Sequence, residues 1–112
     1  MSARLRVLFV CGRARSRSFT AARIFARDPR MQVRAVGVHA SAARVVSASD
    51  IACASAICVM ERSQQRALEG RFRDELRGKR VHVLEIADDY APMEPELVEL
   101  LRESVPPLLG LA

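Results

Sequence analysis

Short apolar runs alternate along this chain with segments of helical periodicity, and the alternation restricts the fold more than any other feature. Apolar runs of strand length lie at 5–10, 31–36, 56–60 and 81–86. Helices are predicted at 18–27, from Ser47 onward, at 61–77, and from Pro95 until Pro106 and Pro107. The order β-α-β-α-β-α-β-α predicts an α/β fold of three α/β/α layers, with a four-stranded parallel sheet joined by right-handed crossovers.

Local signals indicate where several of these helices begin and end. Asp28 and Pro29 end the first helix, because proline disfavours helical backbone in the residue before it. Ser47 and Asp50 have the spacing of a capping box, which predicts a short helix there. Gly78 supplies a stop for the helix at 61–77.

Length and composition predict one domain, 1–112, in the cytoplasm. Half of the residues are hydrophobic, enough for one core. No apolar run has the length of a membrane span, and the first apolar run is too short for a signal peptide. Three cysteines at irregular spacing fit neither a disulfide framework nor a zinc site, so reduced thiols are expected.

The net charge of +5 comes almost entirely from arginine, since Lys79 is the single lysine among 18 basic residues. A positive field of this kind attracts phosphate esters or nucleic acid. Modules that stack bases usually group aromatic residues on one surface, whereas the aromatic residues here are scattered through the sequence. Nucleic acid is therefore the less favoured partner.

Cys11 ends the first predicted strand and is followed by five residues, Arg17 and Ser18. Arginine is so frequent here that about 15% of cysteines would have one six residues later by chance, so the spacing alone is a weak signal. Its position between a strand and a helix strengthens it. Cys53 and Cys58 have no arginine at that spacing and lie in apolar runs, which predicts that both belong to the core.

A loop that enters a helix can turn successive backbone N–H groups inward and form an anion site at the positive end of the helix. Such a site would hold a phosphate group and stabilise the thiolate of Cys11, with a hydrogen bond from Ser18. Arg17 would offer a planar fork to two phosphate oxygens. The predicted phosphate-binding residues are Gly12, Arg13, Ala14, Arg15, Ser16, Arg17 and Ser18.

The segment from Val7 to Ser18 resembles the phosphate loop of the low-molecular-weight protein tyrosine phosphatase family, in a compact bacterial form. Residues 86–90 are similar to that family's acid segment. The resemblance implies a four-stranded parallel sheet and a phosphocysteine intermediate, without metal or cofactor. It makes Cys11, Arg17 and Asp88 the catalytic residues, with Asp88 as general acid. Asp89 stands where the family has proline, which leaves the choice between Asp88 and Asp89 open.

The sequence departs from the family pattern in three places. Ala14 replaces an asparagine that tolerates left-handed backbone and can brace the loop. Phe19 replaces a proline, and segment 38–46 is too short to supply an aromatic pocket wall. Only Tyr90 and Phe19 remain as a predicted substrate rim, which weakens the case for phosphotyrosine.

The function predicted from the sequence is a cysteine-dependent phosphomonoesterase that acts on a phosphorylated protein or a small phosphomonoester, with no membrane partner. An arsenate reductase on the same fold is the alternative, and it would need Cys53 or Cys58 as a relay thiol. A phosphocarrier domain, a catalytically impaired phosphate-binding module and a basic nucleic-acid binder are further alternatives. Ala14 is the residue that favours the impaired module.

Overall fold

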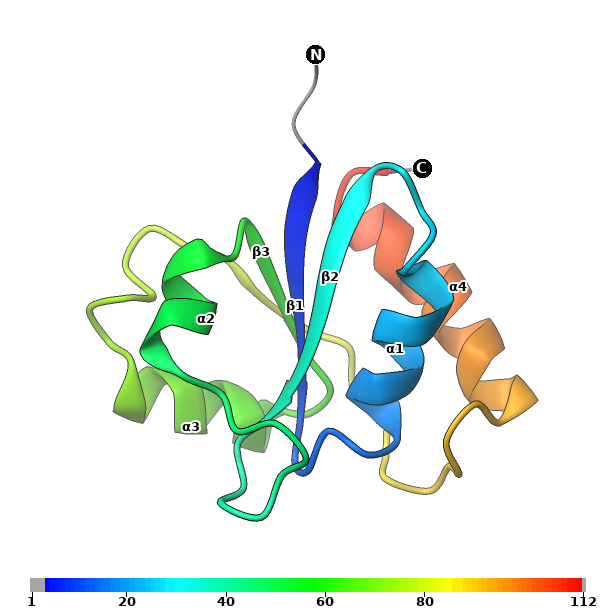
Figure 1. The fold of residues 1–112 in the computed structure, drawn as a ribbon, viewed down its shortest axis with the longest axis horizontal. Coiled ribbons are helices and arrows are strands. Elements are labelled where there is room, and N and C mark those ends of the chain that lie inside the picture. Colours follow the sequence, from blue (N-terminus) through cyan, green and yellow to red (C-terminus); the bar gives the residue numbers. More distant parts are fainter. Residues whose placement is uncertain (1–3, 112) are drawn as a thin grey trace.

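The computed structural model of the protein describes residues 4–111 and has four parallel strands in the order β2-β1-β3-β4 (Figure 1). The predicted α/β class, the parallel sheet and the alternation of elements are confirmed. In chain order the elements are β1 (Leu5–Cys11), α1 (Arg17–Phe25), β2 (Met31–Gly37), α2 (Ala48–Cys53), β3 (Ala56–Val59), α3 (Arg62–Arg71), β4 (Val81–Val83) and α4 (Pro95–Leu108).

Helices cover both faces of the sheet, with α1 and α4 on one side and α2 and α3 on the other (Figure 1). Alternate residues of β1 enter the two cores: Phe9 packs with α1 and α4, whereas Val10 packs with α2 and α3. Burial on both faces explains why β1 is a continuous apolar run rather than an alternating one.

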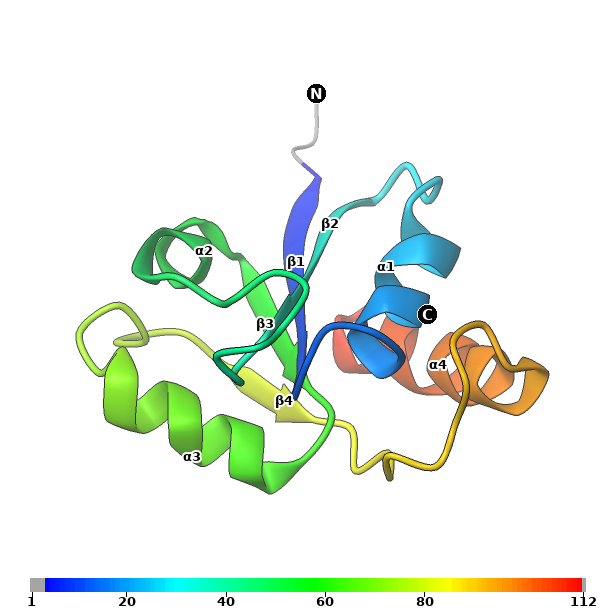
Figure 2. The same cartoon turned by 60° about the horizontal axis from the view of Figure 1, so that its bottom comes forward.

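The sheet order places the cysteine loop at a switch point in the topology. The chain leaves β1 toward β2 on one side and reaches β3 on the other side, so the connections diverge at the carboxyl end of β1. Cys11 is the last residue of that strand and pairs with Gly37, the last residue of β2. Loops that follow β1, β2, β3 and β4 gather at this edge (Figure 2), where ligands of open α/β sheets bind.

The predicted helix at 61–77 is too long, because α3 ends at Arg71. Phe72 leaves the helical conformation at φ −130°, and a separate turn follows, closed by a hydrogen bond from Leu76 N to Phe72 O of 2.9 Å. Phe72 and Leu76 still pack on the core beside α3, which explains why they extended the apolar pattern. Gly78 has a positive φ of 79° and ends this turn rather than α3.

The structure also corrects the ends of the last two elements. Glu85 takes a positive φ of 57° and ends β4 early, although Ile86 N still bonds Met60 O at 2.9 Å. Helix α4 continues through Pro106 and Pro107 to Leu108. The two prolines fall in the last turn, where the carbonyls that they leave without partners belong to solvent-exposed residues.

The predicted capping box of Ser47 and Asp50 is confirmed at the start of α2. Within residues 4–111 no helix is both long and apolar enough to cross a membrane.

Candidate active site

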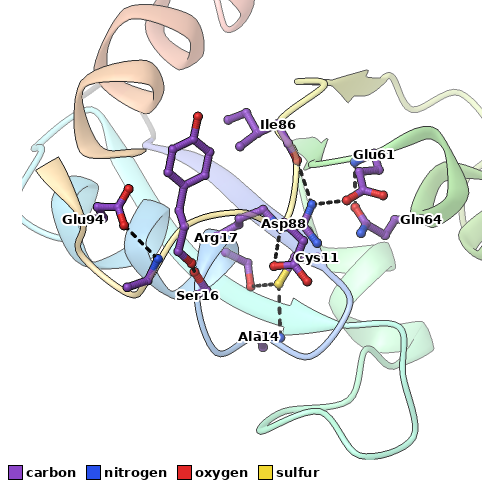
Figure 3. Close-up of polar contacts among 12 residues, drawn as sticks. Cys11, Ala14, Ser16, Arg17, Glu61, Gln64, Ile86, Asp88 and Glu94 are labelled. Atoms are coloured by element: carbon purple, nitrogen blue, oxygen red, sulfur yellow. Dashed lines mark hydrogen bonds and ion pairs between the residues drawn. The ribbon is translucent and has the colours of Figure 1, made fainter. Parts of the chain in front are cut away.

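The sulfur of Cys11 lies at the bottom of the loop between β1 and α1, where it has two polar neighbours (Figure 3). The backbone N–H of Ala14 donates to Sγ over 3.2 Å, and Ser18 Oγ lies 3.0 Å from Sγ. Ser18 is fully buried and has Val36 O as a second neighbour at 3.4 Å. The sulfur thus has one N–H that donates to it and one hydroxyl that can donate to it.

Ala14 has a left-handed backbone, with φ at 58°, and its side chain is buried. This conformation aims the N–H of Ala14 at the sulfur of Cys11. Left-handed backbone costs a residue with a Cβ about 1–2 kcal/mol. The loop therefore has the left-handed backbone for which the family pattern uses asparagine, but here no asparagine side chain supports it.

The first turn of α1 adjoins the loop and leaves its N–H groups without a side-chain cap. Ser16 is the N-cap residue, yet its hydroxyl donates to Tyr90 O at 2.6 Å instead of accepting from α1. Uncapped N–H groups at a helix N-terminus favour an anion. Helix α1 begins at Arg17, and its second residue, Ser18, contacts the sulfur of Cys11.

Arg17 is nearly buried, with 5% of its side chain exposed, and residues from two segments, the start of α3 and the loop after β4, surround its guanidinium. Nη1 donates to the carboxylate of Glu61 and to Ile86 O, the latter at 2.7 Å. Nε lies 3.6 Å from Asp88 Oδ1 (Figure 3). Among residues 4–111, no hydrogen bond engages Nη2, so the Nε–Nη2 edge can receive a ligand's oxygens.

The two adjacent aspartates differ in their relation to this site. Asp88 is 72% exposed and points toward Arg17 (Figure 3). Asp89 is also exposed, and it forms no ion pair with any described residue. Position alone therefore favours Asp88 as the acid.

Besides the bond from Arg17 to Ile86 O, two hydrogen bonds fasten the acid segment and the residues that follow it to α1. One is the bond from Ser16 to Tyr90 O, and the other runs from Met93 N to the buried Thr20 Oγ1 at 2.9 Å. Met93 has a positive φ of 62° at this junction. The position of Asp88 is thus coupled to the same helix that begins at Arg17.

The structure distributes the remaining predicted residues around the loop. Arg13 and Arg15 are exposed, and Arg15 Nη2 donates to Ser41 O at 3.2 Å. Phe19 is 37% exposed on the first turn of α1. Tyr90 is half-buried against the core of α1 and α4 and borders a hollow of about 230 Å³ on α4, so its role as a substrate rim stays a prediction.

Sequence reasoning missed Glu61 and the carbonyl of Ile86, both of which hold Arg17. A signal for Glu61 was available, because it comes directly after the third apolar run and so reaches the same sheet edge as Cys11. No side-chain pattern could have indicated a backbone carbonyl.

The prediction that both other cysteines are core residues is wrong for Cys53, which is exposed at the end of α2. Cys53 O accepts from Arg6, near the start of β1, so this thiol lies about 16 Å along the strand from Cys11. Cys58 is fully buried in β3 beside Phe9, and burial raises the pKa of its thiol to about 12. Neither position suits a relay thiol for arsenate reduction.

The sheet order, with a cysteine loop after β1, defines the fold of the low-molecular-weight phosphatases, and solved structures with this fold match the chain. One is the YwlE arginine phosphatase from Geobacillus stearothermophilus, with a TM-score of 0.72 and 20% identity over 95% of this chain and 94% of that one. Another is the low-molecular-weight phosphotyrosine phosphatase VcLMWPTP-2 from Vibrio cholerae O395, with a TM-score of 0.71 and 18% identity over 95% of each chain.

The low-molecular-weight protein tyrosine phosphatase from T. tengcongensis matches with a TM-score of 0.62 and 17% identity, over 96% of this chain and 94% of that one. No family model and no curated protein sequence matches the chain. At these identities the likeness establishes the fold, and it confirms the fold that the cysteine loop and acid segment led us to expect.

Proposed function

We propose that the protein is a cysteine-dependent phosphomonoesterase that works through a phosphocysteine on Cys11. The observation that carries the proposal is the convergence of the Ala14 N–H and the Ser18 hydroxyl on the sulfur of Cys11, in the loop that leads to Arg17, which is buried and pairs with Asp88 (Figure 3). Phosphatases among the solved structures of this fold support it, including a YwlE variant described as carrying a phosphorylated active-site serine.

In the first step the thiolate of Cys11 attacks phosphorus and forms an S–P bond as the bond from phosphorus to the leaving oxygen breaks. Asp88 in its acid form gives its proton to that oxygen, which leaves as an alcohol or phenol. The hydroxyl of Ser18, 3.0 Å from the sulfur, can donate to it during the attack. Cys11 and Asp88 thus divide the work of covalent catalysis: the thiolate is the nucleophile at phosphorus, and the carboxylic acid protonates the leaving oxygen.

In the second step water attacks the phosphocysteine. The carboxylate of Asp88 takes a proton from that water, the S–P bond breaks, and inorganic phosphate leaves with the thiolate of Cys11 restored. The N–H groups of the loop and the Nε–Nη2 edge of Arg17 bind the phosphoryl oxygens in both steps. In the transition state negative charge is spread over the phosphoryl oxygens. Hydrogen-bond donors that are already fixed in position stabilise that charge most effectively.

The proposed phosphate-binding residues are those of the loop, 12–18, and Phe19 is the aromatic residue at its mouth. The proposed substrate is a phosphorylated protein or a small phosphomonoester. The proposed reaction needs a reduced thiol, so we propose that the protein acts in the cytoplasm. We also propose that 1–112 acts as a single domain, because both cores share the one sheet.

Hydrolysis of an aryl phosphate tests the proposal. Cys11→Ser is expected to abolish turnover, and Arg17→Ala to lower kcat/KM by about 10²–10³. Asp88→Asn is expected to lower kcat by about 10²–10⁴, whereas Asp89→Asn, its exposed neighbour, leaves kcat within about twofold of the wild type. Full activity of Cys11→Ser would contradict the mechanism, and loss of activity in Asp89→Asn alone would move the acid to Asp89.

A further inference from the structure

The segment that follows β2 lies along the outer side of the phosphate loop, as both ribbon views show (Figures 1 and 2). We call this segment, together with the last residue of β2, the brace, which comprises residues 37–43. Three of its N–H groups donate to three consecutive carbonyls of the loop. The bonds run from Val38 N to Cys11 O at 3.1 Å, from His39 N to Gly12 O at 2.8 Å, and from Ala43 N to Arg13 O at 2.9 Å.

These bonds fix the direction of the loop's own N–H groups. In a trans peptide the carbonyl and the following N–H point in opposite directions. Carbonyls of residues 11, 12 and 13 that face the brace therefore turn the N–H groups of Gly12, Arg13 and Ala14 to the other side. The N–H of Ala14 indeed reaches the sulfur of Cys11, at 3.2 Å.

The brace can approach so closely because its first residue is glycine. A Cβ on Gly37 would lie 2.5 Å from Gly12 O and 2.9 Å from the carbonyl carbon of Arg13. It would also lie 2.7 Å from the Cβ of Ala42. Two of these three contacts are with backbone of the phosphate loop, so any side chain at position 37 has to displace the loop or the brace.

Two arginines hold the brace, one from α3 and one from the phosphate loop. Arg71, the last residue of α3, donates through Nη1 to Val38 O at 2.7 Å, and Val38 N is the donor to Cys11 O. Arg15 donates to Ser41 O from the loop side. The brace is therefore tied to α3, and the loop is tied to the brace.

We propose that the brace holds the phosphate loop in its anion-binding conformation before a ligand arrives, and that Gly37 is the positioning residue on which this depends. The inference rests on the proposed function. It explains how the loop keeps the left-handed backbone of Ala14 without an asparagine side chain to brace it. Because the N–H groups are already oriented, binding a phosphate group avoids the entropy cost of ordering them.

The test compares Gly37→Ala with Gly70→Ala, a glycine of α3 whose added Cβ meets nothing within 4 Å. Arg71→Ala is a milder variant that removes only the outer anchor. For each, kcat and KM for an aryl phosphate, competitive inhibition by inorganic phosphate, and urea unfolding are measured. Gly37→Ala is expected to raise KM and the phosphate inhibition constant at least about tenfold, and Arg71→Ala about two- to fivefold, with Gly70→Ala unchanged.

A folded Gly37→Ala variant with wild-type KM and wild-type phosphate inhibition would overturn the inference, as would a loss of stability with no effect on phosphate. If Gly37→Ala does not fold, Arg71→Ala decides, and unchanged phosphate inhibition in that variant overturns it. Protection of Cys11 from alkylation by inorganic phosphate separates the two proposals. An inactive wild type contradicts the phosphomonoesterase, whereas equal protection in wild type and Gly37→Ala contradicts the brace.

Discussion

At position 14 the backbone, and not the side chain, makes the contact with the thiol. Ala14 takes a left-handed conformation that alanine disfavours, and its N–H reaches the sulfur of Cys11. Alanine stands where the family uses asparagine, and this difference favoured the alternative of a catalytically impaired phosphate-binding module. In the structure the loop has the conformation that brings this N–H to the sulfur, and the strain lies in the left-handed backbone of Ala14.

Ala14→Gly should relieve this strain. Glycine adopts positive φ freely, so the gain of about 1–2 kcal/mol in the folded state offsets the entropy that glycine adds to the unfolded state. We expect a free energy of unfolding equal to or slightly above that of the wild type. Ala22→Gly, inside α1, is the matched control and should lose about 1 kcal/mol. Equal losses in the two variants, measured by urea unfolding, would show that Ala14 is unstrained.

Arg17 depends on partners that lie far away in the sequence. Glu61 and the carbonyl of Ile86 hold Nη1, whereas the Nε–Nη2 edge of the guanidinium has only Asp88 as an ion-pair partner among the described residues. Cys11, Arg17 and Ser18 could be singled out from the sequence because they lie within eight residues of one another. Glu61 follows the third apolar run and so could be placed at the same sheet edge, but its contact with Arg17 could not be predicted, because it depends on β3 lying next to β1 in the sheet.

Glu61→Ala is expected to lower kcat/KM for an aryl phosphate about tenfold, because a charged hydrogen bond of about 1.5–3 kcal/mol no longer orients Arg17. Glu61→Gln keeps an oxygen acceptor for Nη1 and should restore most of the activity. Glu69→Ala, on an exposed part of α3, serves as the control. Wild-type kinetics in Glu61→Ala would mean that Ile86 O alone positions the guanidinium.

Among the elements, α2 shows how a six-residue helix is stabilised at both ends. At its start Asp50 accepts from the Ser47 backbone and from Arg34, the latter at 2.8 Å. At its end the single lysine, Lys79, donates to the carbonyls of Ile51, Ala52 and Ala54 at 2.6–2.7 Å. The capping box was predictable because its residues are local, whereas the lysine cap is made by a residue 25 or more positions later.

The carboxyl of Asp50 makes the stability of the fold depend on pH. Burial raises the pKa of Asp50, but hydrogen bonds from Ser47 and Arg34 and the charge of Arg44 outweigh burial, so the net pKa is lowered. A lowered pKa in the folded state stabilises the protein above the unfolded value of about 3.9 and loses that effect as the pH falls through the folded value.

Asp50→Asn should therefore lower the free energy of unfolding at pH 7 by about 2 kcal/mol, and the difference from wild type should shrink below about pH 4. Asp74→Asn, whose aspartate is 85% exposed, is the control and should change little. Urea unfolding at several pH values measures both. A difference that stays constant down to pH 2 would show that the charge of Asp50 is not what stabilises α2.

The helix ends of α3 and α4 show where prediction from sequence stops. Phe72 and Leu76 continue the helical spacing of α3, so periodicity could not reveal that a new turn begins at Phe72. Pro106 and Pro107 predict an early end to α4, but a proline in the last exposed turn removes only bonds that solvent can replace. Packing and exposure decide both cases, and neither is visible in a local pattern.

For the whole molecule, the alternation of elements was sufficient to predict the layers and the parallel sheet, and hence the edge at which the site lies. The three thiols are distributed over this architecture in different surroundings. Cys11 lies at the carboxyl edge of the sheet, Cys53 is exposed near the opposite edge, and Cys58 is buried in β3, an inner strand of the sheet.

Alkylation of the native protein near pH 7 should reflect these surroundings. Cys58 should remain unmodified, because burial shields its thiol and raises its pKa to about 12. Cys53 is exposed and should react. Cys11 is also buried, at 3% exposed, but its sulfur faces the phosphate loop, so it should react more slowly than Cys53, and inorganic phosphate should slow only Cys11. Peptide mapping by mass spectrometry assigns each site, and denatured protein provides the control in which all three react. Equal protection of Cys11 and Cys53 would mean that phosphate does not bind at the loop.

The central claim is that Cys11 carries the phosphoryl group during turnover, and acid quenching tests it most directly. Wild-type protein is mixed with an aryl phosphate, quenched within the first turnovers and digested, and the peptide containing Cys11 is examined by mass spectrometry. A phosphoryl group is expected on Cys11 and on neither Cys53 nor Cys58. In Asp88→Asn more of the phosphocysteine should accumulate, provided that the substitution slows hydrolysis of the phosphocysteine more than its formation. Turnover of the substrate with no phosphoryl group on Cys11 in either protein, and with undiminished activity in Cys11→Ser, would contradict the claim.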